Sequence, residues 1–132
     1  MFVIDKTGKH IIIIKRLKEN RKYNVVPGGR VEIGEKVLDG AIREIREELD
    51  LNICKEDIFD SIKNGTDYFF FAKTNFEVSR LSIHGEELER SNANDVYNPM
   101  WVRIEEINNM CIFPEFNKSV FFEKIDMWRE NG

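Results

Sequence analysis

The chain contains an unbroken run of four isoleucines, Ile11–Ile14, which lies between His10 and Lys15. A strand with one solvated face alternates apolar and polar residues, whereas this run presents apolar side chains in both directions. The run therefore predicts a strand that is buried on both faces. Met1–Ile4 predicts a second strand, connected to the first by the turn Asp5–Lys9. The run is far shorter than the roughly 20 apolar residues of a membrane-spanning helix, so we expect no membrane partner.

The rest of the chain interleaves strand-like and helix-like segments. Strands are expected at Tyr23–Val26, Ile58–Ile62, Asp67–Lys73 and Met100–Arg103, and helices at Lys36–Asp50, Glu105–Asn109 and Pro114–Trp128. Polar composition predicts connections at Lys15–Lys22 and Gly85–Asn98, and Pro114 suits the first turn of its helix. This interleaving predicts an α/β or α+β fold with helices on a mixed sheet. Because the 132 residues contain no linker or repeat, we expect one domain over residues 1–132.

Charge and cysteine usage restrict the classes of partner. The formal net charge is −4, which argues against general nucleic-acid binding because that function normally needs a basic surface. Cys54 and Cys111 have no metal or redox spacing, so free thiols in a reducing cytoplasm are expected. The first ten residues lack the form of a signal peptide. A cytoplasmic protein follows from these observations.

The segment Lys36–Asp50 carries two kinds of side chain on two arcs of one helix. The apolar arc consists of Leu38, Ala41, Ile42, Ile45 and Leu49. The second arc brings together Glu44, Glu47 and Glu48 at the spacing i, i+3 and i+4. Like charges at this spacing oppose folding, and the last turn of a helix, which holds Glu47 and Glu48, disfavours anions. A solvated acidic face is one explanation; a divalent cation such as Mg²⁺, which prefers carboxylate oxygens, is the other.

Flanking residues favour the metal site. The pair Gly28–Gly29 lets the backbone approach a ligand closely and present a carbonyl to it. Arg43 precedes Glu44 directly, and Glu35 lies shortly before the helix body. An arginine held between two glutamates would fix their geometry, as outer residues do around bound metals.

Spacing across this segment resembles the signature box of the Nudix hydrolases. The pattern matches in eight of its nine fixed positions, which are Gly29, Glu35, Arg43, Glu44, Ile45, Glu47, Glu48 and Leu51 within the box Gly29–Leu51. The departure is Asp50, where the family usually has glycine. Aspartate is among the few other residues that tolerate a left-handed helix end, so we expect a small stability cost and intact chemistry.

The resemblance implies a fold and an activity. The fold would be an α/β/α sandwich whose mixed sheet has the box helix on one side and a C-terminal helix. The activity would be hydrolysis of the pyrophosphate linkage of a nucleoside diphosphate joined to a group X, with Mg²⁺ as cofactor and Mn²⁺ as a possible substitute. The substrate is open among nucleoside triphosphates, nucleotide sugars or ADP-ribose-like compounds, and dinucleoside polyphosphates, so the identity of X is open too. A catalytically silent nucleotide-binding domain and a plain α/β interaction module are the alternatives, and a homodimer is allowed.

The resemblance also implies roles for the box residues. Glu47 and Glu48 would be the principal metal ligands, joined by the Gly29 carbonyl. Glu44 would bind metal, activate water, or do both. Arg43 would orient Glu44, and Glu35 would support Arg43. A further carboxylate is expected from outside the box, with Glu86, Glu87 and Glu89 as candidates and Glu87 favoured.

Substrate-binding residues are less sharply defined by the sequence. Arg16, in a basic segment, could attract phosphates, although a solvated surface is as good an explanation. Tyr23 and Tyr97 are the best candidates for stacking on a base, against the alternative that such aromatics are core residues. Gly28 completes the expected substrate-binding set.

Overall fold

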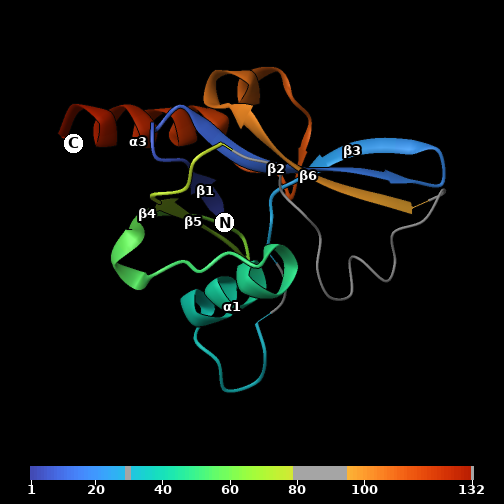
Figure 1. The fold of residues 1–132 in the computed structure, drawn as a ribbon, viewed down its shortest axis with the longest axis horizontal. Helices are drawn as coiled ribbons and strands as arrows, with labels where there is room; N and C mark the ends of the chain where they lie inside the picture. Colours follow the sequence, from blue (N-terminus) through green and yellow to red (C-terminus); the bar gives the residue numbers. More distant parts are fainter. Residues whose placement is uncertain (29–30, 79–94, 132) are drawn as a thin grey trace.

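The computed structural model describes residues 1–28, 31–78 and 95–131 (Figure 1). One sheet and two α-helices dominate this part of the chain. The described elements are β1 (Phe2–Ile4), β2 (His10–Lys18), β3 (Arg21–Val25), α1 (Val37–Leu49), the 3-10 helix η1 (Lys55–Asp57), β4 (Ile58–Asn64), β5 (Asp67–Lys73), β6 (Asp95–Arg103), the 3-10 helix η2 (Ile104–Asn109), β7 (Ile112–Phe113) and α3 (Lys118–Asn131).

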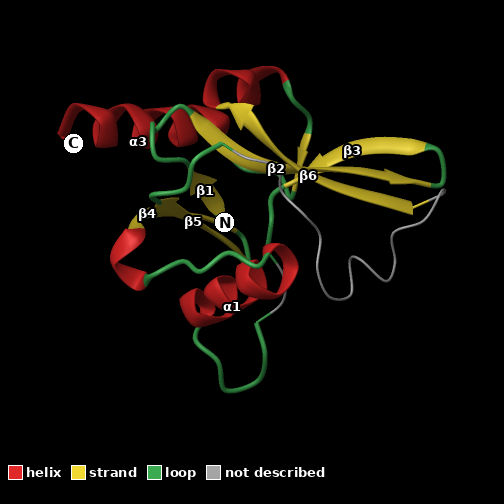
Figure 2. Cartoon of the chain, in the orientation of Figure 1, coloured by secondary structure: helices red, strands yellow, loops and turns green. Residues whose placement is uncertain are grey.

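The sheet is mixed and is organised around β2 (Figure 2). One edge of β2 pairs antiparallel with β6 along its whole length, from His10 opposite Arg103 to Lys18 opposite Asp95. Its other edge pairs antiparallel with β3 and, at Ile11 opposite Ile4, with β1. Parallel pairs join β1 to β5 and β3 to β7, and β4 closes the sheet beside β5. The expected combination of helices with a mixed sheet is confirmed.

Both faces of β1 and of the Ile11–Ile14 part of β2 are buried, as the isoleucine run predicts. Ile11 and Ile13 point into a core under α3, whereas Ile12 points into a second core under α1. We call these the α3-side core and the α1-side core. The exposed fractions of Ile11–Ile14 are 0, 0, 0 and 5%. In Figure 1 the two helices lie on opposite sides of these strands, which gives the expected layered sandwich.

The α1-side core is built by the apolar arc of the box helix. Ile45 and Leu49 are buried against Val3 and Ile12, with Ala41 and Ile42 partly buried beside them. The helix ends at Asp50, which adopts the left-handed conformation with φ 54° and donates its backbone N–H to the Arg46 carbonyl at 3.0 Å. This is the helix end at which the family usually places glycine, and aspartate occupies it as expected.

Aromatic rings fill the α3-side core. Phe121 of α3 meets Phe2 of β1 edge-to-face, with ring centroids 4.9 Å apart, and Phe116 reaches the same ring at 5.0 Å. Trp128 stacks on Phe59 of β4 at 4.9 Å. Such geometries are the favoured ones for aromatic pairs. The helix is thereby fixed across the sheet from α1.

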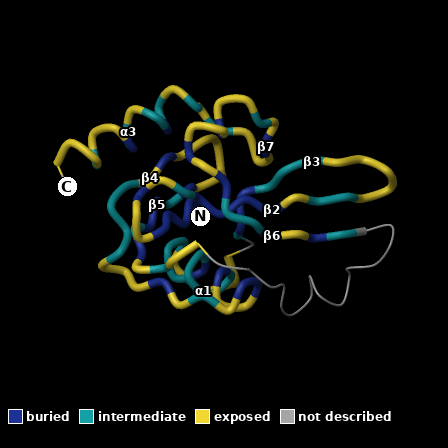
Figure 3. Tube along the Cα trace, turned by 45° about the horizontal axis from the view of Figure 1, so that its top comes forward, coloured by how far each residue is buried: buried dark blue, intermediate teal, exposed yellow. Residues whose placement is uncertain are grey.

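The prediction of a connection at Lys15–Lys22 is wrong. β2 continues to Lys18 and β3 begins at Arg21, joined by a turn whose residues Glu19 and Asn20 have φ of 50° and 65°. Two successive positive φ values suit a tight hairpin turn between twisted strands. The charged residues of this segment lie where the hairpin extends beyond both cores, so their polarity reflects exposure (Figure 3).

Two further expectations need correction. Residues 95–98, expected in a loop, belong to β6, while 85–94 lie outside the described residues. The last helix begins at Lys118 and not near Pro114, because the Asn117 side chain accepts a hydrogen bond from the Val120 N–H at 3.1 Å and so caps the helix there. The short helix expected at Glu105–Asn109 is present as η2.

No helix in the described part of the chain has the length and apolar character to cross a membrane.

Candidate functional site

Glu48 links the box helix to the Pro27–Gly28 turn. The side chain is buried, and its Oε2 accepts a hydrogen bond from the Gly28 N–H at 3.3 Å. Gly28 has φ 146°, a conformation that side-chain-bearing residues rarely adopt. The N-terminal amine of Met1 donates to the Pro27 carbonyl beside it. Burial lowers the pKa of that amine to about 5, although the Glu48 charge acts in the opposite direction.

Arg43 lies at the centre of the carboxylate array. Its Nε and Nη2 donate to the two oxygens of Glu35 at 2.8 and 3.1 Å, which makes a bidentate pair. Its Nη1 donates to Glu44 Oε1 and to Glu47 Oε2, both at 2.9 Å. One planar guanidinium therefore sets the positions of three carboxylates.

The contacts between Arg43 and Glu35 lower the pKa of Glu35 and raise the pKa of Arg43. Hydrogen bonds from Arg43, and from the Glu32 N–H, hold the pKa of Glu35 below its ordinary value of 4.5. The hydrogen bond to Glu35 raises the pKa of Arg43, helped by Glu44. Both groups thus keep their charges at neutral pH, which an orienting ion pair requires.

Gly40 is a site residue that the sequence analysis missed. A Cβ placed on Gly40 would lie 2.8 Å from Glu35 Oε1, so any other residue there would make that carboxylate move from its present position beside the helix. Glycine in the middle of a helix costs about 1 kcal/mol relative to alanine. A glycine inside an otherwise helical pattern is the signal that points to such a packing role.

The three carboxylates at the end of α1 differ in their access to solvent. The side chain of Glu47 is 52% exposed and that of Glu44 is 19% exposed, whereas Glu48 as a residue is only 7% exposed. Glu44 and Glu47 face Arg43 while Glu48 faces Gly28, and within the described residues no three acidic, histidine or cysteine side chains converge as a metal site. The donor chemistry nevertheless fits Mg²⁺, because three hard oxygen ligands lie within about one helical turn and Glu47 has solvent around it.

The structure brings together three of the four substrate-binding candidates. Arg16 on β2 lies directly opposite Tyr23 on β3 and Tyr97 on β6. Its guanidinium carbon is 4.3 Å from the Tyr97 ring centroid and 5.8 Å from that of Tyr23, within the range of cation–π contacts. Residues alternate along a strand, so Arg16 shares the face of Ile12, which is the α1 side of the sheet.

Tyr97 is not free to stack on the base of a substrate. It is buried, and Arg16 already lies over its ring, so Tyr23 is the more accessible of the two tyrosines. Trp101 of β6 lies opposite Ile12, and its buried indole N–H has no hydrogen-bond acceptor among the described residues. Gly29 and the candidates Glu86, Glu87 and Glu89 lie outside the described residues.

Comparison with known proteins decides the family. The NUDIX domain model matches residues 1–121. The chain belongs to the NUDIX family. The matched segment holds the whole box, and it extends from β1 into α3, where residue 121 lies. The resemblance noted from the box is therefore confirmed over most of the chain.

Individual NUDIX relatives are distant. Nudix hydrolase 5 of Arabidopsis thaliana is 24% identical over 119 residues, which are 89% of this chain and 38% of that protein. The uncharacterized Nudix hydrolase YvcI of Bacillus subtilis strain 168 is 27% identical over 112 residues, 83% of this chain and 68% of the relative. A MutT structure, from work on the Aliivibrio salmonicida and Vibrio cholerae proteins, has a TM-score of 0.62 and 24% identity and covers 96% of this chain and 93% of its own. The expected fold is thus confirmed, and membership in a family of hydrolases supports the expected enzyme class.

Proposed function

We propose that this chain hydrolyses the pyrophosphate linkage of a small nucleoside diphosphate derivative, with Mg²⁺ as cofactor and Mn²⁺ as an effective substitute. The observation that carries the proposal is the array of three carboxylates around Arg43, in a chain of the NUDIX family. On the helix itself Glu44, Glu47 and Glu48 lie three and four residues apart; like charges at this spacing oppose helix stability, and a divalent cation shared by these carboxylates would relieve the conflict.

Glu44, Glu47 and Glu48 would hold the cation, and the Gly29 carbonyl would join them. A bound Mg²⁺ would neutralise charge on the substrate phosphates and make a bound water more acidic. Glu48 is buried and held by the Gly28 N–H, whereas Glu47 is held by Arg43 and is half exposed, so a ligand can reach it from solvent. The box thus offers one buried and one exposed carboxylate.

The chain's own residues prepare the attack of water on phosphorus. Glu44, oriented by Arg43 and largely shielded from solvent, is suited to take a proton from the attacking water. Glu35 keeps Arg43 in place through its bidentate pair, so it acts as a positioning residue. Glu87 would supply a further carboxylate as ligand or base.

Substrate recognition would use the α1 side of the β2–β3–β6 face. The cationic Arg16 would attract the phosphates, and the half-buried Tyr23 would offer a ring for the base. Gly28 would let the backbone approach the substrate closely. Tyr97 would hold Arg16 in position through the contact between its ring and the Arg16 guanidinium. The substrate would then be a nucleoside triphosphate, a nucleotide sugar or ADP-ribose-like compound, or a dinucleoside polyphosphate.

A panel of these compounds, incubated with Mg²⁺ or with a chelator, tests the proposal. We expect turnover of at least one compound that the chelator abolishes. We expect Glu47→Gln to lower turnover by at least about two orders of magnitude while the circular dichroism spectrum and melting temperature stay unchanged. Glu123→Gln is the matched control: it makes the same charge change at an exposed position of α3 and should leave turnover unaltered.

Two outcomes would contradict the proposal. Near-normal turnover in well-folded Glu47→Gln would refute the assignment of that ligand. Failure to turn over any compound, together with the absence of a Mg²⁺-induced thermal shift, would favour the two non-enzymatic alternatives, a silent nucleotide-binding domain and a plain α/β interaction module. Binding of nucleotide without turnover would identify the first of these directly.

Three broader features belong to the same proposal. A cytoplasmic location is supported by Cys54 and Cys111, which are both exposed free thiols. A single domain over residues 1–132 is supported by the two cores, which share the strands β1 and β2. The net charge of −4 supports a small-molecule substrate over nucleic acid. Light scattering after size-exclusion chromatography would decide between a monomer and a homodimer.

A further inference from the structure

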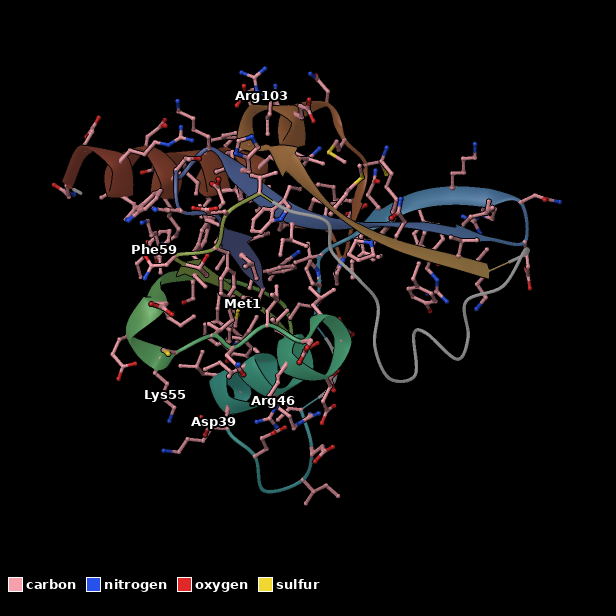
Figure 4. All side chains as sticks on the ribbon, viewed as in Figure 1. Met1, Asp39, Arg46, Lys55, Phe59 and Arg103 are labelled. Atoms are coloured by element: carbon pink, nitrogen blue, oxygen red, sulfur yellow. The ribbon has the colours of Figure 1, made fainter. Side chains whose placement is uncertain are left out.

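A pocket of about 930 Å³ lies away from the box, where four separate segments meet. It is formed by the β1–β2 turn, the ends of β5 and β6, and the C-terminal part of α3; the lining residues are Lys6, Thr7, Gly8, Lys9, His10, Lys73, Arg103, Glu105, Trp128 and Arg129. No residue of α1 is among them. Figure 4 shows Arg103 well separated from Asp39 and Arg46 of α1.

The lining of this pocket is basic in a chain that is acidic overall. Five of the lining residues are lysine or arginine and one is a carboxylate, although the chain has a net charge of −4. Glu105 pairs with Arg103 at 3.1 Å, and both side chains are more than half exposed. Lys6 pairs with Glu77 at 3.8 Å, whereas Lys9 and Lys73 form no ion pair within the described residues. Two of the five cations therefore have a carboxylate partner in this part of the chain, and the pocket keeps positive charge that ion pairs do not offset.

The pocket floor is a rigidly built turn. The buried carboxylate of Asp5 accepts hydrogen bonds from the backbone N–H groups of Lys9 and His10 at 3.1 and 3.0 Å and from the Thr7 hydroxyl at 2.7 Å. Its Oδ2 also lies 3.1 Å from His10 Nδ1, so the imidazole is held by the same group. These bonds orient the turn from within.

The pocket wall is fixed by α3. Gly8 has φ 75°, and a Cβ on it would lie 3.0 Å from the Trp128 ring. Arg129 donates from Nη2 to the Gly8 carbonyl at 2.9 Å, which anchors its guanidinium at the rim while other N–H groups remain for a ligand. Turn and helix are thus joined by packing and by a hydrogen bond.

We propose that this pocket binds a compact anion with several phosphate groups, at a site separate from the carboxylate array of the box. Cations from four segments surround a hollow, and this arrangement matches a compact multivalent anion better than an extended acidic peptide, which would need a linear stripe. Guanidinium groups such as those of Arg103 and Arg129 match phosphate oxygens in geometry as well as charge. Inorganic oligophosphate and the phosphate chain of a nucleotide share this chemistry.

Calorimetric titration of the intact chain with inorganic tripolyphosphate, in the presence of EDTA, tests the proposal. The chelator removes metal-bridged binding at the acidic box, so the remaining signal reports on basic sites. We expect the double substitution Lys9→Gln and Arg103→Gln to weaken binding about tenfold or more, because it removes two charge-assisted contacts. Lys55→Gln with Lys63→Gln removes the same charge elsewhere and should change affinity less than about twofold.

A substitution of opposite sign guards against unfolding as an explanation. Glu105→Gln removes the pocket's carboxylate and should tighten tripolyphosphate binding severalfold, which a damaged protein would not do. Equal affinities for ATP and tripolyphosphate would show that the phosphates alone are recognised, and tighter ATP binding would add a contact to the base; both results uphold the site. Undetectable binding of both, unchanged affinity in the Lys9–Arg103 variant, an equal loss in the control, or preference for an oligoglutamate peptide would overturn it.

Discussion

Replacing Gly40 by alanine tests how Glu35 is positioned against the box helix. In a helix interior this substitution ordinarily stabilises by about 1 kcal/mol. Here the new Cβ would lie 2.8 Å from Glu35 Oε1, which is 0.6 Å short of the 3.4 Å at which ordinary contact begins. That oxygen accepts hydrogen bonds from Arg43 Nη2 at 3.1 Å and from the Glu32 N–H at 2.9 Å. A shift of this oxygen away from the new Cβ should lengthen and weaken these hydrogen bonds.

The substitution should therefore change sign with the residue at position 35. In the otherwise unaltered chain we expect Gly40→Ala to give no stabilisation and to lower turnover, because Arg43 loses its support. In a Glu35→Ala background the clash is absent, so the same change should stabilise by about 1 kcal/mol. Urea unfolding of the four proteins, followed by tryptophan fluorescence, gives the double-mutant cycle. Equal effects in the two backgrounds would refute the reasoning.

Three further predictions concern stability. Ile45→Ala should lower the free energy of unfolding by about 2–5 kcal/mol in urea, because Ile45 is fully buried in the α1-side core. Asp50→Gly should be neutral or stabilise by up to about 1 kcal/mol, since Asp50 is left-handed; a lower melting temperature would contradict this. The stability that Glu35 adds relative to Glu35→Gln should be present above pH 4.5 and disappear as the pH falls through its lowered pKa, as unfolding at several pH values would show.

Structural features that depend on residues close together in the sequence were predictable from local patterns. The isoleucine run predicted a strand with two buried faces, and the spacing of Ile45 and Leu49 predicted the buried side of α1. Helix spacing also accounts for the contact of Arg43 with Glu47, because residues four apart are neighbours on a helix. The bidentate pair of Arg43 with Glu35 and the bond of Glu48 to Gly28 join the helix to the segment before it, so helix periodicity does not predict them.

Features that depend on contacts between distant segments were not predictable. The two-residue strand β7 exists only because it pairs with β3, and its length is too short for any periodicity. The hairpin around Glu19 looked like a loop because its residues are charged and exposed. The basic pocket is lined by Lys9, Lys73 and Arg129, which are far apart in the sequence, and their spacing does not predict that they lie together.

The strand pair β1–β2 acts as a partition inside the molecule. Adjacent residues such as Ile12 and Ile13 face different compartments, which share no buried side chain among the described residues. Redesign for heat resistance can therefore work on the compartment beneath α3 while leaving untouched the one that supports the box helix. Related sequences should show the same division. Substitutions at Ile11 and Ile13 of β2 should be accompanied by changes in the core under α3, and substitutions at Ile12 by changes in the core under α1.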